Sequence, residues 1–300
     1  MEGCLLHTAF SDFSDAIRAA GLQPPDVIVP GKLHRFPGGG KRLSNRAGWC
    51  LLFEDGRAGC FGDWSTGLSD VWLVARGERL SRVEQDTFNR KVKAARKHAE
   101  AERRFRHREA AKRAATIWTE SGLVPDNHSY LKRKRIWPHG AKLFKNSLVL
   151  SIIDFTGKLN SLQFIAPDGE KRLLSGGRKS GCFIMVSGDM SNPSKVIICE
   201  GWATGCTLFD HHSDALVLAA IDAGNLRSVA MSTRCQWPSA ELIIAGDDDR
   251  LTSGNPGVTK AQEAAAASGA RIMLPEWPDD APESLSDFND LAVWLEGGDV

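Results

Sequence analysis

The chain has 300 residues, of which 42% are hydrophobic and 25% charged, and its formal net charge is +1. This is the composition of a folded chain long enough for more than one domain, which excludes a disordered or fibrous protein. No apolar run approaches the about 18 residues of a membrane span, and the N-terminus has no secretory pattern, so we expect a soluble cytoplasmic protein without a membrane partner.

The charges are unevenly distributed along the chain. Residues 90–113 hold 11 Lys and Arg against 3 Asp and Glu, whereas the segment after Arg271 holds 8 acidic residues and no Lys or Arg. This polarity suggests a nucleic-acid-binding part joined to a metal-binding part, although solvated surface explains many charge runs. The 7 cysteines include no CxxC pair, which indicates reduced thiols without a disulfide framework or a recognisable zinc site.

The first part of the chain predicts a small β module over residues 1–80. Residues 11–21 favour a short amphipathic helix that Gly21 ends. Short segments at 34–36, 48–53 and 58–64 then alternate with Gly-rich turns, and Asp55-Gly56 is a strong hairpin signal. The module is rich in aromatic residues, namely Phe36, Trp49, Phe61, Trp64 and Trp72.

Residues 81–122 predict a long basic helix that connects two parts of the chain. Ala, Arg, Lys and Glu dominate it without Pro or Gly, and its apolar positions are sparse. One interpretation is that Arg103 and Arg104, together with Lys132 and Arg133 in the basic segment that follows, contact nucleic-acid phosphates. The other interpretation is a solvated linker helix.

The remainder of the chain predicts a β-rich basic subdomain at 123–190 and an α/β domain at 191–300. Turn signals at 156–157 and 167–169 separate strands of the first, which also contains a basic glycine loop at 176–179. In the second, apolar runs alternate with helical patterns near 202–210, 225–232 and 258–268. This alternation predicts a parallel sheet covered by helices, so the overall fold class is α/β.

Carboxylates follow two of the apolar runs. Glu200 comes directly after VIIC, and Asp247, Asp248 and Asp249 follow LIIAG. Because open α/β sheets place their chemistry at the carboxyl ends of strands, we expect Glu200, Asp247 and Asp249 to converge. Adjacent carboxylates repel one another unless a cation is present, and oxygen ligands suit Mg²⁺ or Mn²⁺. The plainer alternatives are a helix-entry residue at Glu200 and a solvent-exposed acidic loop.

The ordered set of these segments resembles a known family. CEGWATG, IIAGDDDR, Asn255-Pro256-Gly257 and SDFNDL, preceded by GKLNSLQFIAPDGEKRLLSGGRKSGCF, are similar to the Toprim primases of phages, plasmids and other mobile elements, which are related to DnaG. The resemblance covers about residues 30–295 and is strongest over 148–292. It implies an N-terminal module like a zinc ribbon. We expect no structural zinc there, because the candidate ligands His34, Cys50 and Cys60 lack paired spacing.

The resemblance also implies roles for individual residues. Glu200, Asp247 and Asp249 match the catalytic, metal-binding carboxylates, and Glu200 is either a ligand or a general acid or base. Asp287 is a further candidate metal ligand or an ordinary helix N-cap. Lys171 and Arg172, with Arg178 and Lys179 in the glycine loop, fall where such primases bind template and nucleotide.

The predicted function is that of a DNA primase. Such an enzyme makes short RNA primers on single-stranded DNA from ribonucleoside triphosphates, with a replicative helicase as a possible separate partner. No GxxxxGK[ST] loop is present, so we expect no helicase activity within this chain. Two alternatives remain, a Toprim nuclease and a non-catalytic single-strand-binding protein. A topoisomerase is disfavoured because Tyr130 is the only tyrosine.

Overall fold

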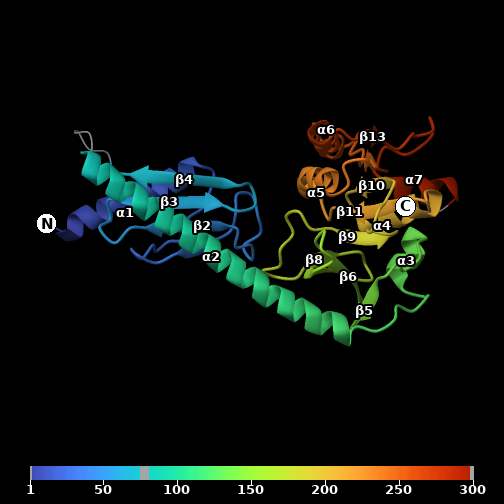
Figure 1. The fold of residues 1–300 in the computed structure, drawn as a ribbon, viewed down its shortest axis with the longest axis horizontal. Helices are drawn as coiled ribbons and strands as arrows, with labels where there is room; N and C mark the ends of the chain where they lie inside the picture. The colour runs from blue at the N-terminus through green and yellow to red at the C-terminus, as the bar shows by residue number, and fades with distance from the viewer. Residues whose placement is uncertain (1, 75–80, 298–300) are drawn as a thin grey trace. The chain divides into compact units, whose positions relative to one another are not determined.

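The computed structural model describes residues 2–74 and 81–297, in two compact units, 1–105 and 106–300 (Figure 1). The N-terminal unit contains α1 and a four-stranded antiparallel sheet in the order β1-β2-β3-β4. Its elements are α1 (Glu2–Ala19), β1 (His34–Phe36), β2 (Gly48–Leu52), β3 (Ala58–Asp63) and β4 (Leu68–Leu73). The hairpin predicted at Asp55-Gly56 joins β2 to β3, and the predicted first helix begins earlier than residue 11.

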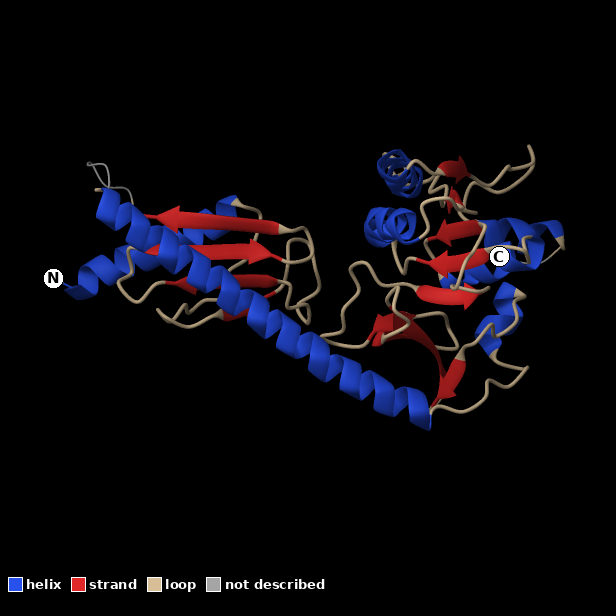
Figure 2. Cartoon of the chain, in the orientation of Figure 1, coloured by secondary structure: helices blue, strands red, loops and turns tan. Residues whose placement is uncertain are grey.

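The N-terminal sheet is covered by a helix on each face (Figure 2). Because side chains alternate along a strand, Cys50 and Leu52 of β2 pack on the side of α1, whereas Leu51 packs on the side of α2 (Arg82–Glu120), against Ala95. Cys60 lies on the α2 side, opposite to Cys50. The two thiols therefore face different clusters and do not point to a common ligand.

Helix α2 buries small side chains in both units. Ala95 and Ala99 pack in the N-terminal unit, and Ala110 and Ala114 are fully covered in the C-terminal unit. Phe105, between these pairs, is 54% exposed. The four-residue spacing within each pair places both members on one helix face, so a sequence with few large apolar residues still forms two packed seams.

The C-terminal unit contains a small antiparallel sheet and a larger mixed one. The small sheet has the order β5-β6-β7-β8, and the larger sheet the order β13-β12-β10-β11-β9. The elements that lead through the small sheet to the edge of the larger one are α3 (Ser129–Lys134), β5 (Lys142–Phe144), β6 (Ser147–Ile153), β7 (Leu159–Ile165), β8 (Lys171–Leu173) and β9 (Ile184–Ser187). The elements that follow are β10 (Lys195–Cys199), α4 (Trp202–His211), β11 (Leu216–Ala219), α5 (Ala223–Gln236), β12 (Glu241–Ala245), α6 (Pro256–Ser268), β13 (Arg271–Met273) and α7 (Phe288–Leu295).

The larger sheet confirms the predicted α/β fold. Strands β10 to β13 are parallel, and only the edge strand β9 runs antiparallel, to β11. Ile197 packs on the side of α4, and Ile198 on the side of α5 and α6. Both faces of the central strands are thus buried, which explains why they are unbroken apolar runs. Within the described ranges, no helix combines the length and apolar character needed to cross a membrane.

Candidate active site

Three carboxylates leave the larger sheet at one edge. Strand β10 pairs with both β11 and β12, with Cys199 opposite Ala219 and Ala245. Glu200 follows β10 directly and Asp247 follows β12 after one glycine, as expected from the sequence. Asp222, which follows β11, joins them at the same edge. The parallel register therefore brings these side chains to one place.

Glu200 is half-buried and lies among other charges. The backbone N–H of Ala223, at the start of α5, donates a hydrogen bond to its carboxylate. Burial raises the pKa of Glu200, and the carboxylates of Asp222 and Asp249 raise it further, while Lys171 acts in the opposite direction. A carboxylate in these surroundings gains from any additional positive charge.

Asp247 is strongly perturbed by its surroundings. Burial, followed by the charges of Glu200, Asp287 and Asp249, raises the pKa of Asp247 from 3.8 to about 9. Its Oδ1 atom is buried and has no hydrogen-bond partner among the described residues. An orphaned, buried carboxylate oxygen beside other carboxylates is a place where a hard cation fits.

The loop after Asp247 is held by the Asn255-Pro256-Gly257 segment. Asn255 has a left-handed backbone (φ 40), its Oδ1 accepts the Asp249 N–H at 2.9 Å, and its amide donates to Asp248 at 2.6 Å. The Gly257 N–H donates to Asp249 Oδ2 at 2.9 Å, and a Cβ at Gly257 would lie 2.4 Å from the carbonyl oxygen of Asp247. Only glycine permits this close approach of the start of α6 to the loop.

The members of the Asp triplet differ in their contacts. Asp248 turns away from the site, because its second oxygen accepts the indole N–H of Trp277 at 2.8 Å. Asp287 caps α7, where its Oδ1 accepts the N–H groups of Asn289 at 2.8 Å and Asp290 at 2.9 Å. Burial raises the pKa of Asp287, and the Asp290 charge adds to the effect.

Asp287 nevertheless faces the candidate site as well as its helix. The hydroxyl of Thr204 in α4 donates a hydrogen bond to Asp287, and the Asp287 charge is one of those that raise the pKa of Asp247. The N-cap role is therefore seen directly, and it leaves Asp287 close enough to act electrostatically on Asp247.

The four predicted phosphate-binding cations have different surroundings. Lys171 faces the carboxylates: its charge lowers the pKa values of Glu200 and Asp247, and its Nζ lies 3.8 Å from the position that a Cβ of Gly201 would take. The other three are ion-paired, Arg172 with Glu170, Arg178 with Asp154 at 3.7 Å, and Lys179 with Asp222. Of the four, Lys171 is the one whose charge acts on both Glu200 and Asp247, whereas Lys179 reaches the same edge of the sheet through its ion pair with Asp222.

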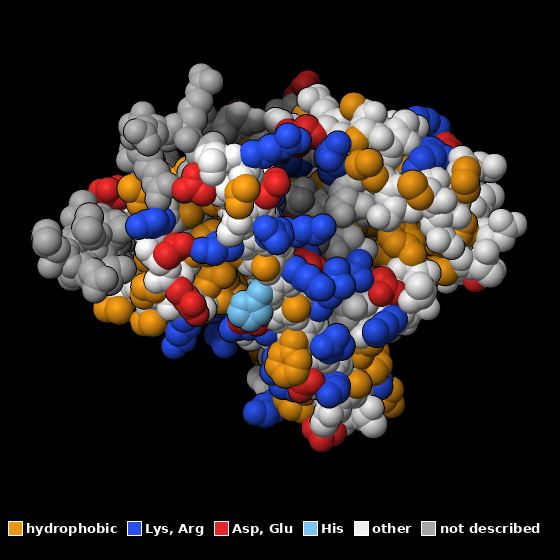
Figure 3. Space-filling view, turned by 60° about the vertical axis from the view of Figure 1, so that its left-hand side comes forward, with side chains coloured by type: hydrophobic (Ala, Val, Ile, Leu, Met, Phe, Trp, Pro, Cys, Tyr) orange, Lys and Arg blue, Asp and Glu red, His pale blue; other side chains and the backbone are white. Residues whose placement is uncertain are grey.

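The weaker nucleic-acid candidates lie on two helices. Arg103 and Arg104 of α2 both pair with Glu100, at 2.8 and 3.1 Å, and the Arg104 side chain is 70% exposed. Lys132 and Arg133 are exposed on α3, and Arg133 donates to the carbonyl of Pro167 at 3.1 Å. Lys and Arg side chains are numerous on the face of the molecule that Figure 3 presents.

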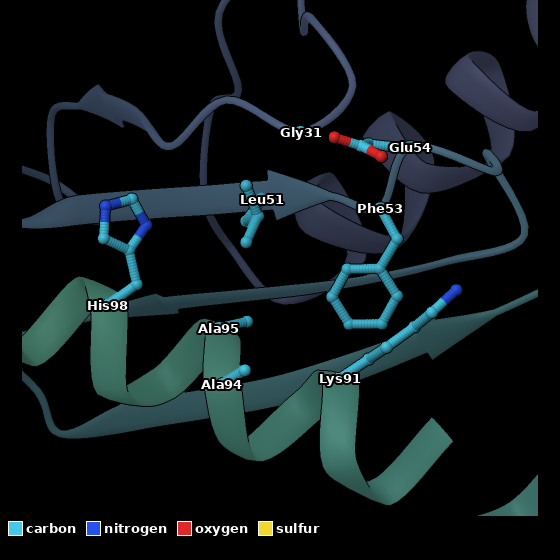
Figure 4. Close-up of a pocket in the computed structure, with 8 residues that line it drawn as sticks. All are labelled: Gly31, Leu51, Phe53, Glu54, Lys91, Ala94, Ala95 and His98. Carbon is cyan, nitrogen blue, oxygen red and sulfur yellow. The ribbon is translucent and has the colours of Figure 1, made fainter. Parts of the chain in front are cut away.

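The N-terminal unit has its own aromatic and hollow features. The guanidinium carbon of Arg35 lies 3.8 Å from the centre of the Trp64 ring, which stacks on the buried Trp49. A pocket of about 330 Å³ lies beside the contact between β2 and α2 (Figure 4). It is lined by Gly31, Leu51, Phe53, Glu54, Lys91, Ala94, Ala95 and His98. Of the aromatic residues noted in the sequence, Trp49 is therefore part of the core, and Trp64 is covered by Arg35.

Sequence reasoning missed Asp222 and Asn225. The signal for Asp222 was present, because the apolar run ALVLAAI also ends in a carboxylate. The sequence contains no such signal for Asn225, since an asparagine near the start of a helix is ordinary. Only the fold shows that its side chain contacts residues 179–182.

The carboxylate oxygens are the kind of ligand that a divalent cation prefers, but their present arrangement is not that of a formed metal site. Among the residues that the structure describes, no three Asp, Glu, His or Cys side chains are gathered closely enough to hold a metal ion as they stand. Asp249 binds the Gly257 N–H, and Asp287 binds α7. The oxygen-only donor set and the orphaned oxygen of Asp247 still fit Mg²⁺ or Mn²⁺.

Comparisons with known proteins give the family. Residues 195–296 match the family described as the Toprim domain. Two Escherichia coli proteins named DNA primase TraC are 34% identical over 284 residues and 32% identical over 286 residues, each over 89% of this chain. The chain spans about a quarter (26%) of the length of the first relative and a fifth (20%) of the second.

Solved primase structures show partial likeness. The primase fragment of the bacteriophage T7 primase-helicase protein is 14% identical and aligns over 60% of this chain and 76% of its own, with a TM-score of 0.42. The DnaG primase catalytic domain bound to single-stranded DNA is 15% identical and aligns over 60% and 58%, with a TM-score of 0.34. The family match and the long sequence alignments agree with the strand-end carboxylates: residues 195–296 match the Toprim domain, and the chain is similar to the TraC primases over 89% of its length.

Proposed function

We propose that the protein is a DNA primase of the mobile-element type, which joins ribonucleotides into short primers on single-stranded DNA. The observation that carries this proposal is the meeting of Glu200, Asp247 and Lys171 at one sheet edge, where Asp247 Oδ1 is orphaned. Hydrolysis needs only the carboxylates, whereas a polymerising site must also hold a triphosphate. Lys171 beside the carboxylates supplies charge for it.

Glu200 and Asp247 would hold Mg²⁺ or Mn²⁺, with Asp249 and Asp287 as the further candidate ligands. When bound, the ion neutralises the triphosphate and favours attack by the 3′-hydroxyl. The chain's own residues would orient the reactants. The Gly257 and Asn255 contacts hold the loop that carries Asp247 and Asp249, and Lys171, whose charge acts on Asp247, would face the phosphates. Glu200 would either bind the ion or move a proton.

The proposed partners are single-stranded DNA, ribonucleoside triphosphates and a replicative helicase that acts as a separate protein. We propose that the N-terminal unit and the exposed cations of α2, including Arg104, contact the template phosphates. Arg172, Arg178 and Lys179 would reach nucleic acid or nucleotide by exchanging their present carboxylate partners for phosphate. A cytoplasmic location belongs to the same proposal, because template and nucleotides are found there.

The proposal is tested by primer synthesis on single-stranded DNA with labelled ribonucleotides and Mg²⁺ or Mn²⁺. We expect wild-type protein to make short RNA and Asp247→Asn to lose at least a hundredfold in rate. The matched control is Glu241→Gln, which removes one negative charge from the opposite end of the same strand, where Glu241 makes an exposed ion pair with Arg271. The control should retain primer synthesis.

The same assay separates the alternatives. Metal-dependent cutting of the template without nucleotides, lost in Asp247→Asn, would replace the primase by a nuclease. If the protein makes no primers and does not cut the template, but binds DNA tightly and Asp247→Asn binds equally well, the protein is a single-strand-binding protein. The structure adds to the argument against a topoisomerase, because the Tyr130 side chain is only 2% exposed and its hydroxyl is not presented to DNA.

A further inference from the structure

Asn225 ties the basic loop to the larger sheet. The side chain is 2% exposed and lies in the first turn of α5. Its amide nitrogen donates to the carbonyl oxygens of Lys179 at 3.2 Å, Cys182 at 2.8 Å and Ala220 at 2.9 Å. Its Oδ1 accepts the N–H of Gly181 at 3.0 Å. Three of these four bonds hold the segment 179–182, which leads from the basic glycine loop into β9.

This set of bonds requires an amide. A carboxylate could accept from Gly181 but would set an oxygen against three carbonyl oxygens, and an alanine would leave all four backbone groups without these partners. The loop is also confined at Gly177, where a Cβ would lie 1.9 Å from Ser161 Oγ. The path of the loop is thus held at two points, by Asn225 at residues 179–182 and by Ser161 at Gly177.

The same turn of α5 is connected to the carboxylate site. Asp222, three residues before Asn225, forms an ion pair with the Lys179 ammonium. The Asp222 charge raises the pKa of Glu200, and the N–H of Ala223 donates to Glu200. One short stretch, 222–225, therefore holds Lys179 by its backbone and by its side chain, next to Glu200.

We propose that Asn225 is a positioning residue that holds Lys179 for the triphosphate of the incoming nucleotide, and that Asp222 is the counter-ion which the triphosphate displaces. This inference rests on the proposed primase function. Lys179 is half-exposed and its ammonium is a mobile point charge, so exchanging a single carboxylate for a polyanion needs only rotation of its side chain.

The test measures KM and kcat for ATP in primer synthesis at saturating metal, together with equilibrium binding of a fluorescent ATP analogue. Asn225→Ala is expected to raise KM about tenfold with kcat changed less than threefold, and Lys179→Ala to do the same. Because Asn225 acts through Lys179, the double variant should be no worse than Lys179→Ala alone. Multiplying effects, or a loss confined to kcat, would overturn the inference.

Asp222→Asn keeps the inference testable if Asn225→Ala does not fold. Asp222 is partly exposed, and this change frees the Lys179 ammonium without disturbing a buried amide. We expect a two- to fivefold lower KM for ATP and tighter analogue binding; an unchanged or higher KM would contradict the counter-ion role. If wild type makes no primers but the variants alter analogue binding as stated, the primase proposal fails and this inference stands. If primers form and the variants behave like wild type, the primase proposal stands and the inference about Asn225 and Asp222 fails.

Discussion

At the residue scale, the buried carboxyl group of Asp247 lowers the stability of the fold when no cation is bound. Because burial and three neighbouring carboxylates raise the pKa of Asp247 from 3.8 to about 9, its charged form is disfavoured in the fold. A carboxyl group whose pKa is raised by folding destabilises the protein increasingly as pH rises from the unfolded value toward the folded one. The penalty is therefore present at neutral pH and is relieved by a bound cation.

The first prediction follows from this sign. At pH 8 in EDTA, Asp247→Asn should have a free energy of unfolding higher than that of wild type by on the order of 1 kcal/mol, and it should therefore unfold at a higher temperature. Adding Mg²⁺ should stabilise wild type and leave the variant almost unchanged. Thermal unfolding with and without Mg²⁺ measures both effects, and Glu241→Gln should respond to Mg²⁺ like wild type. A variant less stable than wild type in EDTA would contradict the argument.

The cysteines give a second prediction at this scale. Burial raises the pKa of Cys50 to about 12 and those of Cys60 and Cys182 to about 11, whereas Cys235 on α5 is exposed. In a Cys4→Ser background, a maleimide at pH 7.5 should modify one thiol quickly, since the thiolate is the reactive form and the buried thiols stay protonated. Mass spectrometry should locate the adduct on Cys235. A second thiol reacting at a similar rate would show that the core opens.

At the scale of elements, strands and helices were more predictable than the loops that make the site. Gly-rich turns and the Asp55-Gly56 signal located β2 and β3 to within a residue or two, apolar runs did the same for β10 and β12, and the absence of breakers gave α2 almost to its ends. The order of carboxylates after strands, with the family resemblance, gave Glu200 and Asp247. The contacts of Asp222 and Asn225 with the basic loop were not predictable, because they join segments 43 to 46 residues apart.

The third prediction concerns the close approach of α6 to the loop after β12. A Cβ at Gly257 would lie 2.4 Å from the carbonyl oxygen of Asp247, so Gly257→Ala must displace either the loop or the helix start. We expect a loss of about 1–3 kcal/mol in stability and at least tenfold in primer synthesis, because the carboxylates move together. Gly122→Ala is the control, since no atom lies within 4 Å of its added Cβ. Wild-type activity in Gly257→Ala would show that the loop's position is not critical.

At the scale of the whole molecule, the net charge conceals how the protein would meet nucleic acid. A total of +1 predicts little attraction to DNA, yet residues 90–113 alone carry 11 − 3 = 8 excess positive charges, and the segment after Arg271 carries 8 negative ones. Many of the cations on α2 are exposed, including Lys97 and Arg104. Screening at physiological salt limits exposed charges to a range of about 8–10 Å, so the local charge of the helix, rather than the total charge of the chain, decides how strongly it attracts phosphates.

The last prediction tests whether this local charge binds single-stranded DNA. For each phosphate contact the slope of log K against log salt is about 0.7 for a single strand, so the double variant Lys97→Gln/Arg104→Gln should reduce the slope by about 1.4. Fluorescence anisotropy of a labelled oligonucleotide, measured from about 50 to about 300 mM NaCl, gives the slope. Arg271→Gln/Lys260→Gln removes the same charge from positions outside α2 and, if α2 makes the contacts, should leave the slope unchanged. Equal reductions of the slope in both variants would mean that DNA binding depends on the total charge and that α2 is a solvated linker. An unchanged slope in the α2 variant would mean that the template contacts lie elsewhere.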